Sequence, residues 1–267
     1  MTTTGAEPVN ESAQSLRPIM DTSAARGGAT AAEVDKQRAY YEQTAHAYDT
    51  LHGQDDEHLL ALHFMAGMID LYGIKSVLDI GAGTGRVAQY LKARHPDLRV
   101  VSLEPVRALR EIGYAKGLSE TELIDGDATQ LDFADGQFDL VCEFATLHHI
   151  KHPELAVREM LRVSGVAIFI SDSNNFGQGT PLARTFKHIA NAMGLWRVVD
   201  LIKTRGKGYT ISEGDGLGYS YSVYNSFREI RQACEVHAVN TVDSGINPYR
   251  TASHVALFGR KRQRLGA

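Results

Sequence analysis

The sequence predicts an α/β domain built on a doubly wound, mostly parallel sheet, and three observations lead to this fold class. Short apolar segments alternate with amphipathic segments of helical length between residues 76 and 171. Residues 166–171 (VAIFIS) are almost continuously apolar, as expected of a strand covered by helices on both faces. A glycine-rich turn directly follows the first apolar segment, 76–80. Sheets of this kind bind ligands at the carboxyl ends of their strands, so we expect the functional site there.

Length and composition limit the possible functions. The chain has 267 residues and a formal net charge of −4, which suits one α/β domain and provides no general attraction for nucleic acid or an anionic membrane. We therefore expect neither among its partners. Two cysteines without CxxC spacing favour a reducing, cytoplasmic location over a disulfide framework. Residues 1–33 lack apolar periodicity and are expected to form a disordered tail, which leaves 34–267 as the domain.

Two helices are expected before the first strand. Their apolar faces are predicted to be Tyr41, Ala45 and Tyr48 in the first helix, and Leu60, Phe64, Met68 and Leu71 in the second. The first five strands are expected at 76–80, 98–103, 122–124, 138–143 and 166–171. Helices are expected at 86–93, 107–115 and 152–162.

The regular alternation ends after the fifth strand. Thr180 and Pro181 are typical of a helix start, and that helix is expected to carry an apolar face of Phe186, Ile189, Met193 and Trp196. Residues 204–224 are rich in Gly and Tyr and predict a loop or irregular hairpin. Residues 174–224 are therefore expected to form a helical and loop lid between the fifth and sixth strands.

A last helix and two strands complete the expected domain. Ser226 and Glu229 have the spacing of a capping box, for a helix that directs Phe227, Ile230 and Cys234 inward. The sixth and seventh strands are expected at 236–242 and 254–259.

The glycine-rich turn, VLDIGAGTGR at 77–86, indicates a nucleotide site. Its glycines allow the backbone to turn sharply and to approach a ligand closely. A nicotinamide cofactor site prefers GxGxxG, whereas this turn is GxGxG followed by Arg86. Asp79, just before the turn, suits an ammonium group and repels a pyrophosphate, and Glu104 ends the next strand, where a carboxylate can bind ribose hydroxyls. These features favour S-adenosylmethionine and leave a nicotinamide-dependent oxidoreductase as the weaker alternative.

Five segments together resemble the successive motifs of class I S-adenosylmethionine-dependent methyltransferases, especially the small-molecule branch. They are YYEQTAHAYD (40–49), DIGAGTG (79–85), SLEP (102–105), GDATQLDFADGQFDLV (126–141) and EFATLHHI (143–150). The resemblance implies a Rossmann-like fold and S-adenosylmethionine as cofactor. The cofactor-binding residues that it implies are Tyr48, Asp79, Gly81, Ala82, Gly83, Gly85, Glu104, Pro105, Asp127, Ala128, Glu143 and Phe144.

Within this resemblance each part of the cofactor has an implied neighbour. Asp79 and the glycines line the methionine part, Glu104 holds the ribose, and Asp127 receives the adenine amino group. Glu143 and Phe144 are implied to form the wall near the methyl group. An N-terminal tyrosine reaches the cofactor carboxylate in several relatives, which makes Tyr41 and Tyr48 candidates.

Three histidines, His148, His149 and His152, follow the fourth strand. An imidazole titrates near neutral pH, so one of them is a candidate general base, with the alternative that they only shape a loop. We expect no metal site, because adjacent imidazoles tend to diverge and no suitably spaced carboxylate precedes Asp172. The catalytic candidates are His149, His148 and Tyr41.

The expected activity is methyl transfer to an O, N or C nucleophile of a small-molecule metabolite. A non-catalytic regulatory or scaffold module that binds S-adenosylmethionine is the alternative. Homodimer formation is compatible with either. The acceptor is expected to contact lid tyrosines, unless these only pin the lid to the sheet; the tyrosines are Tyr209, Tyr219, Tyr221 and Tyr224. Exposed cations that could bind an anionic acceptor are Arg205, Lys207 and Arg250.

Overall fold

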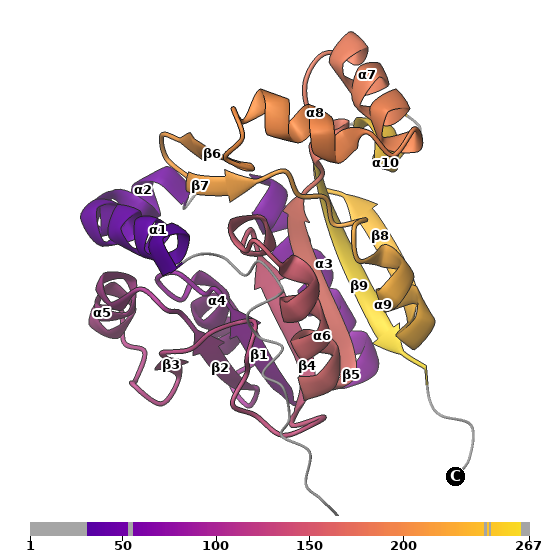
Figure 1. Cartoon of the computed structure of the whole chain (residues 1–267). Helices are drawn as coiled ribbons and strands as arrows, with labels where there is room; N and C mark the ends of the chain where they lie inside the picture. The colour runs from indigo at the N-terminus through magenta and orange to yellow at the C-terminus, as the bar shows by residue number, and fades with distance from the viewer. Residues whose placement is uncertain (1–30, 53–55, 243–244, 246, 263–267) are drawn as a thin grey trace, which may run out of the picture.

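A computed structural model describes residues 31–52, 56–242, 245 and 247–262 (Figure 1). Its centre is a seven-stranded sheet and its outer end carries a separate hairpin. The strands of the sheet are β1 (Ser76–Ile80), β2 (Arg99–Leu103), β3 (Leu123–Ile124), β4 (Phe138–Phe144), β5 (Ser164–Ser173), β8 (Cys234–Asn240) and β9 (His254–Lys261). They lie in the order β3-β2-β1-β4-β5-β9-β8, and β9 runs antiparallel to the other six strands. The hairpin pairs β6 (Tyr209–Ser212) with β7 (Gly216–Tyr219).

Helices cover both faces of the sheet and one of its ends. The α-helices are α1 (Ala31–Thr44), α2 (Tyr48–His52), α3 (Asp56–Tyr72), α4 (Arg86–Arg94), α5 (Arg107–Ala115), α6 (Pro153–Val163), α7 (Pro181–Ala192), α8 (Trp196–Lys203), α9 (Phe227–Ala233) and α10 (Pro248–Thr251). Short 3-10 helices are η2 (Ala45–Ala47), η3 (Leu147–His149) and η4 (Asn175–Gly177). No helix in these described ranges is long and apolar enough to cross a membrane.

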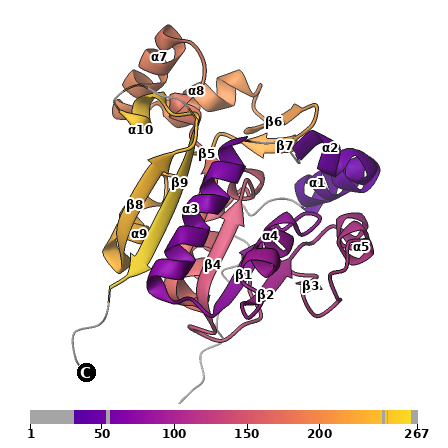
Figure 2. The same cartoon turned by 180° about the vertical axis from the view of Figure 1, so that it is seen from behind.

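The two faces of the sheet carry separate hydrophobic clusters. Helices α6 and α9 lie on the face seen in Figure 1, and α3 and α4 lie on the face seen in Figure 2. Met65 of α3 and Leu91 of α4 pack in one cluster with Phe169 of β5. Met160 of α6 packs in the other with Ile168, the next residue of the same strand. Alternate residues of β5 are thus buried on opposite faces, which explains its continuous apolar sequence.

The sequence prediction of a doubly wound sheet is confirmed. The glycine-rich turn connects β1 to α4, and the lid segment leaves the carboxyl end of β5. Helices α1, α2, α7 and α8 and the hairpin gather at this end of the sheet in both views (Figures 1 and 2). The fold therefore places the candidate site beneath segments from both the N-terminal and the lid regions.

The predicted apolar face of α3 is wrong for Leu60 and Leu71, which are 48% and 67% exposed. Phe64 and Met68, the other two predicted residues, are half-buried and pack against the core cluster of the sheet. The apolar residues of α3 that are fully buried are Ala61, Leu62, Met65, Ala66 and Ile69. Apolar residues surround most of this helix, so periodicity alone does not choose a face. The two alanines settle the choice because small side chains allow the helix to approach the sheet closely.

The single long lid helix is also wrong. Thr180 does cap α7, since its Oγ1 accepts a hydrogen bond from the Ala183 amide at 3.3 Å. Gly194 has a φ of +72° and separates α7 from α8. Phe186, Ile189 and Met193 are 58%, 55% and 65% exposed. The apolar stripe is present, but it does not pack on the sheet.

Two smaller predictions differ from the structure at element ends. The Ser226 side chain makes no capping bond, because its φ and ψ of −96° and 6° lie outside the extended region that a cap requires. Its predicted partner Glu229 instead pairs with Arg158 at 3.0 Å. At the N-terminus, helix α1 already begins at Ala31, and the rest of the predicted disordered tail lies outside the described residues.

Candidate functional site

The turn after β1 is held against the end of β2. The amides of Gly81 and Ala82 both donate to the Leu103 carbonyl, at 2.7 and 3.1 Å. Gly81, Gly83 and Gly85 all have positive φ, where glycine is strongly preferred. A Cβ on Gly83 would lie 2.5 Å from the Tyr48 hydroxyl oxygen. The glycines thus allow both the turn and the close approach of the N-terminal region.

Gly81 offers a direct test of this turn. A Cβ there would lie 2.1 Å from Thr146 Oγ1, in a backbone conformation with φ of +68°. We expect Gly81→Ala to destabilise the fold by more than the roughly 1–2 kcal/mol of left-handed strain alone. Gly73→Ala is the matched control, because Gly73 has φ of +63° and no atom within 4 Å of the added Cβ. Denaturant unfolding of both variants measures the difference, and equal losses would contradict a tight contact at Gly81.

Glu104 follows β2 and braces the same turn. Its carboxylate accepts hydrogen bonds from the amides of Gly83 at 2.9 Å and Val106 at 2.8 Å. The side chain is almost fully buried, and this burial raises the pKa of Glu104 to about 7. Each carboxylate oxygen can accept a second hydrogen bond, and Glu104 lines the main cavity. It can therefore bind hydroxyl groups while it keeps the turn in place.

Asp79 is buried beneath the turn and is incompletely paired. Its Oδ1 accepts a weak bond from Cys142 Sγ at 3.7 Å, whereas Oδ2 has no hydrogen-bond partner in the described part of the chain. Burial raises the pKa of Asp79 to about 7. A small cavity of about 40 Å³ adjoins Asp79 and is also lined by Gly81, Ala82 and Tyr48. A buried carboxylate oxygen without a donor is suited to a cationic ligand group.

The main cavity, of about 710 Å³, lies above the carboxyl ends of the parallel strands. Its volume is in the ordinary range for a site that binds small molecules. The predicted site residues that line it are Tyr41, Tyr48, Gly81, Glu104, Pro105, Asp127, Ala128, Phe144, His148 and His149. Asp79 and Ala82 line the smaller cavity.

Three predicted cofactor residues lie behind the walls of both cavities. Gly83 and Gly85 shape the turn from outside them. Glu143 is fully buried, and its Oε2 accepts a bond from the Thr146 amide at 2.9 Å. Burial and the nearby Asp172 raise the pKa of Glu143 well above its usual value. Glu143 is thus a buried carboxyl group beneath the floor of the cavity, and its neighbour Phe144 forms part of the wall.

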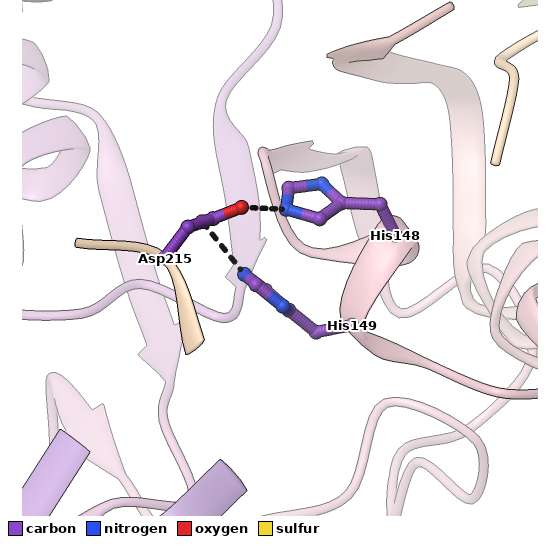
Figure 3. A group of neighbouring side chains, drawn as sticks. All are labelled: His148, His149 and Asp215. Carbon is purple, nitrogen blue, oxygen red and sulfur yellow. Dashed lines mark ion pairs between the residues drawn. The ribbon is translucent and has the colours of Figure 1, made fainter. Parts of the chain in front are cut away.

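His148, on η3, is fixed from below. Its Nδ1 lies 2.7 Å from Oδ1 of the fully buried Asp172, and its own amide donates to the other carboxylate oxygen at 3.2 Å. Its Nε2 lies 3.3 Å from Oδ2 of Asp215 (Figure 3). Burial alone would lower the pKa of His148, but the two carboxylates outweigh burial and raise it well above 6.5. His148 therefore carries a positive charge at neutral pH.

His149 has the opposite protonation state. Its Nδ1 lies 2.7 Å from the Leu217 carbonyl, which can only accept, and 3.1 Å from Gln37 Nε2, which can only donate. The shorter contact, with the carbonyl, favours a proton on Nδ1. Its Nε2 lies 3.2 Å from the Tyr41 hydroxyl and 3.3 Å from Oδ1 of Asp215 (Figure 3). Burial and the charge of His148 lower the pKa of His149. His149 is therefore neutral at pH 7 and presents a lone pair on Nε2.

Asp215 comes from the turn of the β6–β7 hairpin, and sequence analysis did not identify it. Helix α1 positions this turn: the Tyr40 hydroxyl accepts from the Gly214 amide at 2.7 Å, and Gln37 Oε1 accepts from the Leu217 amide at 2.5 Å. The only sequence signal was the turn GDG at 214–216. His58 and His254, a second pair of imidazoles lining the cavity, also lacked a sequence signal.

The remaining histidine and the lid tyrosines differ in whether they line the cavity. His152 lines the cavity but pairs with Glu154 at 3.2 Å, away from the other two imidazoles. Tyr219 lines the cavity, and the ring of Tyr209 packs edge-on against the ring of Tyr219. Tyr221 is 2% exposed within the core.

The other tyrosines and cations considered as acceptor contacts lie away from the cavity. Tyr224 packs on Phe227. For Tyr221 and Tyr224, therefore, the alternative applies that these tyrosines hold the lid on the sheet and do not contact the acceptor. Arg205, Lys207 and Arg250 lie outside the cavity lining. Trp196 packs edge-on against Phe176, as a structural residue.

His148, His149 and Asp215 are also the one group, within the described ranges, with three potential metal ligands within 4.8 Å of one another. The imidazoles of His148 and His149 converge on the carboxylate of Asp215. The expectation that adjacent imidazoles diverge, which was our geometric argument against a metal site, is therefore wrong here. The opposite protonation states of the two histidines agree instead with a charge pair between His148 and Asp215 beside a neutral His149.

Comparison with known proteins decides the type of domain. Residues 78–168 match a family model described as a methyltransferase domain. The chain is 35% identical over 94 residues to norajmaline N-methyltransferase of Rauvolfia serpentina, covering 34% of this chain and 32% of that one. It is 38% identical over 89 residues to demethylmenaquinone methyltransferase of Renibacterium salmoninarum, covering 33% and 36%. The chain thus covers about a third of the length of these curated relatives.

Solved structures agree on the fold. A Thermotoga maritima protein described as an S-adenosylmethionine-dependent methyltransferase and possible histamine N-methyltransferase has a TM-score of 0.52 at 17% identity. That match covers 84% of this chain and 99% of the other. Residues 78–168 thus match a methyltransferase domain, on a fold that is shared with an S-adenosylmethionine-dependent methyltransferase of known structure. This result removes the nicotinamide-dependent alternative.

The geometry fits the cofactor of this methyltransferase domain, S-adenosylmethionine. The unpaired Oδ2 of buried Asp79 is an acceptor for an ammonium group. Glu104 provides acceptors for hydroxyls in the adjoining main cavity. Asp127 lines the same cavity, and its Oδ1 accepts from the Thr129 amide at 2.8 Å. The acidic residues of the methyltransferase domain thus lie along one connected ligand surface.

Proposed function

We propose that the protein transfers the methyl group of S-adenosylmethionine to an O, N or C nucleophile of a small-molecule acceptor. One observation carries the proposal: the neutral imidazole of His149 lines the same cavity as Glu104. Relatives named for norajmaline and demethylmenaquinone methylation support a small-molecule acceptor.

The cofactor supplies an electrophilic methyl group on a sulfonium, so the protein needs mainly to align the reacting atoms and to exclude water. We assign Asp79 to the ammonium group, Glu104 to the ribose hydroxyls and Asp127 to the adenine amino group. Tyr48 covers the glycine turn and is a further candidate for the methionine part. Phe144 provides an apolar wall.

His149 is proposed to remove a proton from acceptors that need deprotonation. Its Nε2 lone pair accepts the proton, and the carboxylate of Asp215 at 3.3 Å stabilises the imidazolium that forms. His148 is a positioning residue, because its charge holds Asp215 from one side while Asp172 fixes its ring. The Tyr41 hydroxyl donates to the Asp215 backbone carbonyl at 3.3 Å and lies 3.2 Å from His149 Nε2, in the place that an acceptor hydroxyl or amine would take.

The lid then takes part in catalysis as well as in acceptor recognition. Asp215 reaches the cavity only when the β6–β7 turn lies on α1, through the contacts of Tyr40 and Gln37. Acceptor recognition is proposed to involve this turn and Tyr219. Closure of the turn would complete the proton-accepting group and exclude water in one movement.

The decisive experiment is incorporation of labelled methyl from S-adenosylmethionine into a metabolite extract. We expect label in small molecules with the parent protein. With Glu104→Ala we expect cofactor affinity to fall by about 1.5–3 kcal/mol, the scale for hydrogen bonds to a charged group. Cofactor binding without label transfer to any extract would favour the non-catalytic module. Labelling that survives Glu104→Ala at unchanged cofactor affinity would contradict the assigned ribose contact.

A further inference from the structure

Two consecutive helices of the lid, α7 and α8, expose large apolar side chains. Leu182 and Phe186 on α7 are 84% and 58% exposed, and Ile202 on α8 is 74% exposed. The other large apolar residues exposed on these helices and their junction are Ile189, Met193, Leu195, Val198 and Leu201. On each helix they recur at intervals of three or four residues, which places them along one side. Exposed apolar stripes of this size indicate an interaction surface.

The same segment carries an excess of positive charge. Residues 181–212 contain six lysines and arginines and one acidic residue, Asp200, in a chain whose net charge is −4. Arg197, Lys203, Arg205 and Lys207 are exposed, and within the described ranges none of them pairs with a carboxylate. Asp200 accepts a hydrogen bond from Ser220, so its charge is turned toward the hairpin. The negative net charge of the whole chain therefore does not reveal this local excess of positive charge.

The position of the segment leaves this surface accessible. Helices α7 and α8 lie at the outer end of the molecule, beyond the carboxyl ends of the strands (Figures 1 and 2). The segment continues into the β6–β7 hairpin, where Ile211 is 63% exposed. The surface therefore lies on the same lid that delivers Asp215 to the cavity.

We propose that the α7–α8 surface docks on an anionic lipid bilayer. Amphipathic helices with apolar and cationic faces bind in the interfacial plane, where apolar side chains enter the acyl boundary and cations meet lipid phosphates. A second copy of the chain fits less well, because a two-fold interface would bring the same positive charges together. Docking does not require methyl transfer, so binding alone tests it.

The test is co-sedimentation of the full chain with vesicles made of equal parts phosphatidylcholine and phosphatidylglycerol. We expect binding to these vesicles, little binding to pure phosphatidylcholine, and weakening as salt is raised. Leu182→Ser combined with Ile202→Ser should weaken binding at least tenfold. Leu71→Ser is the matched control, because Leu71 is 67% exposed on α3, outside the lid, and should leave binding unchanged.

Charge reversal separates the electrostatic contribution. Lys203→Glu combined with Lys207→Glu should abolish the preference for anionic vesicles, whereas Lys75→Glu, an exposed lysine outside the lid, should not. Thermal unfolding of each variant identifies any folding defect. Absence of binding to anionic vesicles, or equal binding by lid and control variants, would overturn the proposal. Concentration-dependent dimers in analytical ultracentrifugation that the Leu182/Ile202 variant dissolves would assign the surface to a second copy instead.

Discussion

Replacing His149 with alanine is expected to lower kcat by about 10²- to 10⁴-fold, the usual contribution of a general base. Affinity for S-adenosylmethionine should change little, because the cofactor groups proposed here contact Asp79, Glu104 and Asp127. Steady-state kinetics with the acceptor found by methyl labelling, together with calorimetric cofactor binding, measure the two effects separately. Added imidazole should restore part of the rate in His149→Ala, which loss of a merely structural ring would not allow.

The pH dependence follows from the lowered pKa of His149. The base works when neutral, so kcat/KM should rise with pH through a pKa below 6.5 and remain level above it. His152→Ala is the matched control, because that ring lines the cavity but does not contact Asp215. Near-normal turnover of His149→Ala would contradict the assignment of His149 as the general base. Loss of activity on chelation, with return on adding Zn²⁺, would assign His148, His149 and Asp215 to a metal instead.

The doubly wound sheet and its main strands were predictable from sequence because local signals were unambiguous. The strand at 76–80 ends at a glycine turn, and the strand at 166–171 is apolar on both faces, so neither has a competing interpretation. Helix α3 shows the limit: apolar residues occupy most of its circumference, and only packing against the sheet selects Met65 over Leu60. Helix α7 shows the same limit, since an apolar stripe indicates a partner without identifying it.

Sequence alone could suggest the residues that we propose to bind the cofactor, but it could not suggest all of the group that we propose to accept the proton. Asp79, Glu104 and Asp127 lie directly at strand ends or just beyond them, where topology alone brings them together. Asp215 reaches His149 only because α1 fixes the β6–β7 turn, an arrangement of three segments far apart in sequence. We expected the imidazoles of His148 and His149 to point in different directions. This expectation was wrong, because Asp172 fixes the ring of His148 and the Leu217 carbonyl fixes the ring of His149. These are tertiary hydrogen bonds without a local pattern.

Asp79→Asn is expected to weaken S-adenosylmethionine binding and to stabilise the cofactor-free protein. The buried Oδ2 has no hydrogen-bond partner in the described ranges, and an ammonium group would supply a charge-assisted bond. Loss of the negative charge should cost about 1.5–3 kcal/mol of binding free energy, or roughly 10- to 150-fold in Kd. Calorimetric titration of the parent and the variant measures this difference.

The stabilisation follows from the raised pKa of Asp79, about 7 in the fold because of burial against about 3.9 in an unfolded chain. Between these values the folded protein holds a proton that the unfolded chain has released, so stability without cofactor falls as pH rises and stays low above pH 7. An asparagine has no charge to bury, so at pH 8 its Tm should exceed that of the parent, by about 2–4 °C for each kcal/mol recovered. The gain should vanish toward pH 4, where the parent carboxyl is protonated in both states. Asp97→Asn, at an exposed position, should change neither Tm nor Kd. A lower Tm of Asp79→Asn at pH 8 with an unchanged Kd would show that Asp79 supports the turn and does not bind the cofactor. A higher Tm together with a higher Kd would show that the buried charge of Asp79 is retained for cofactor binding at the expense of stability.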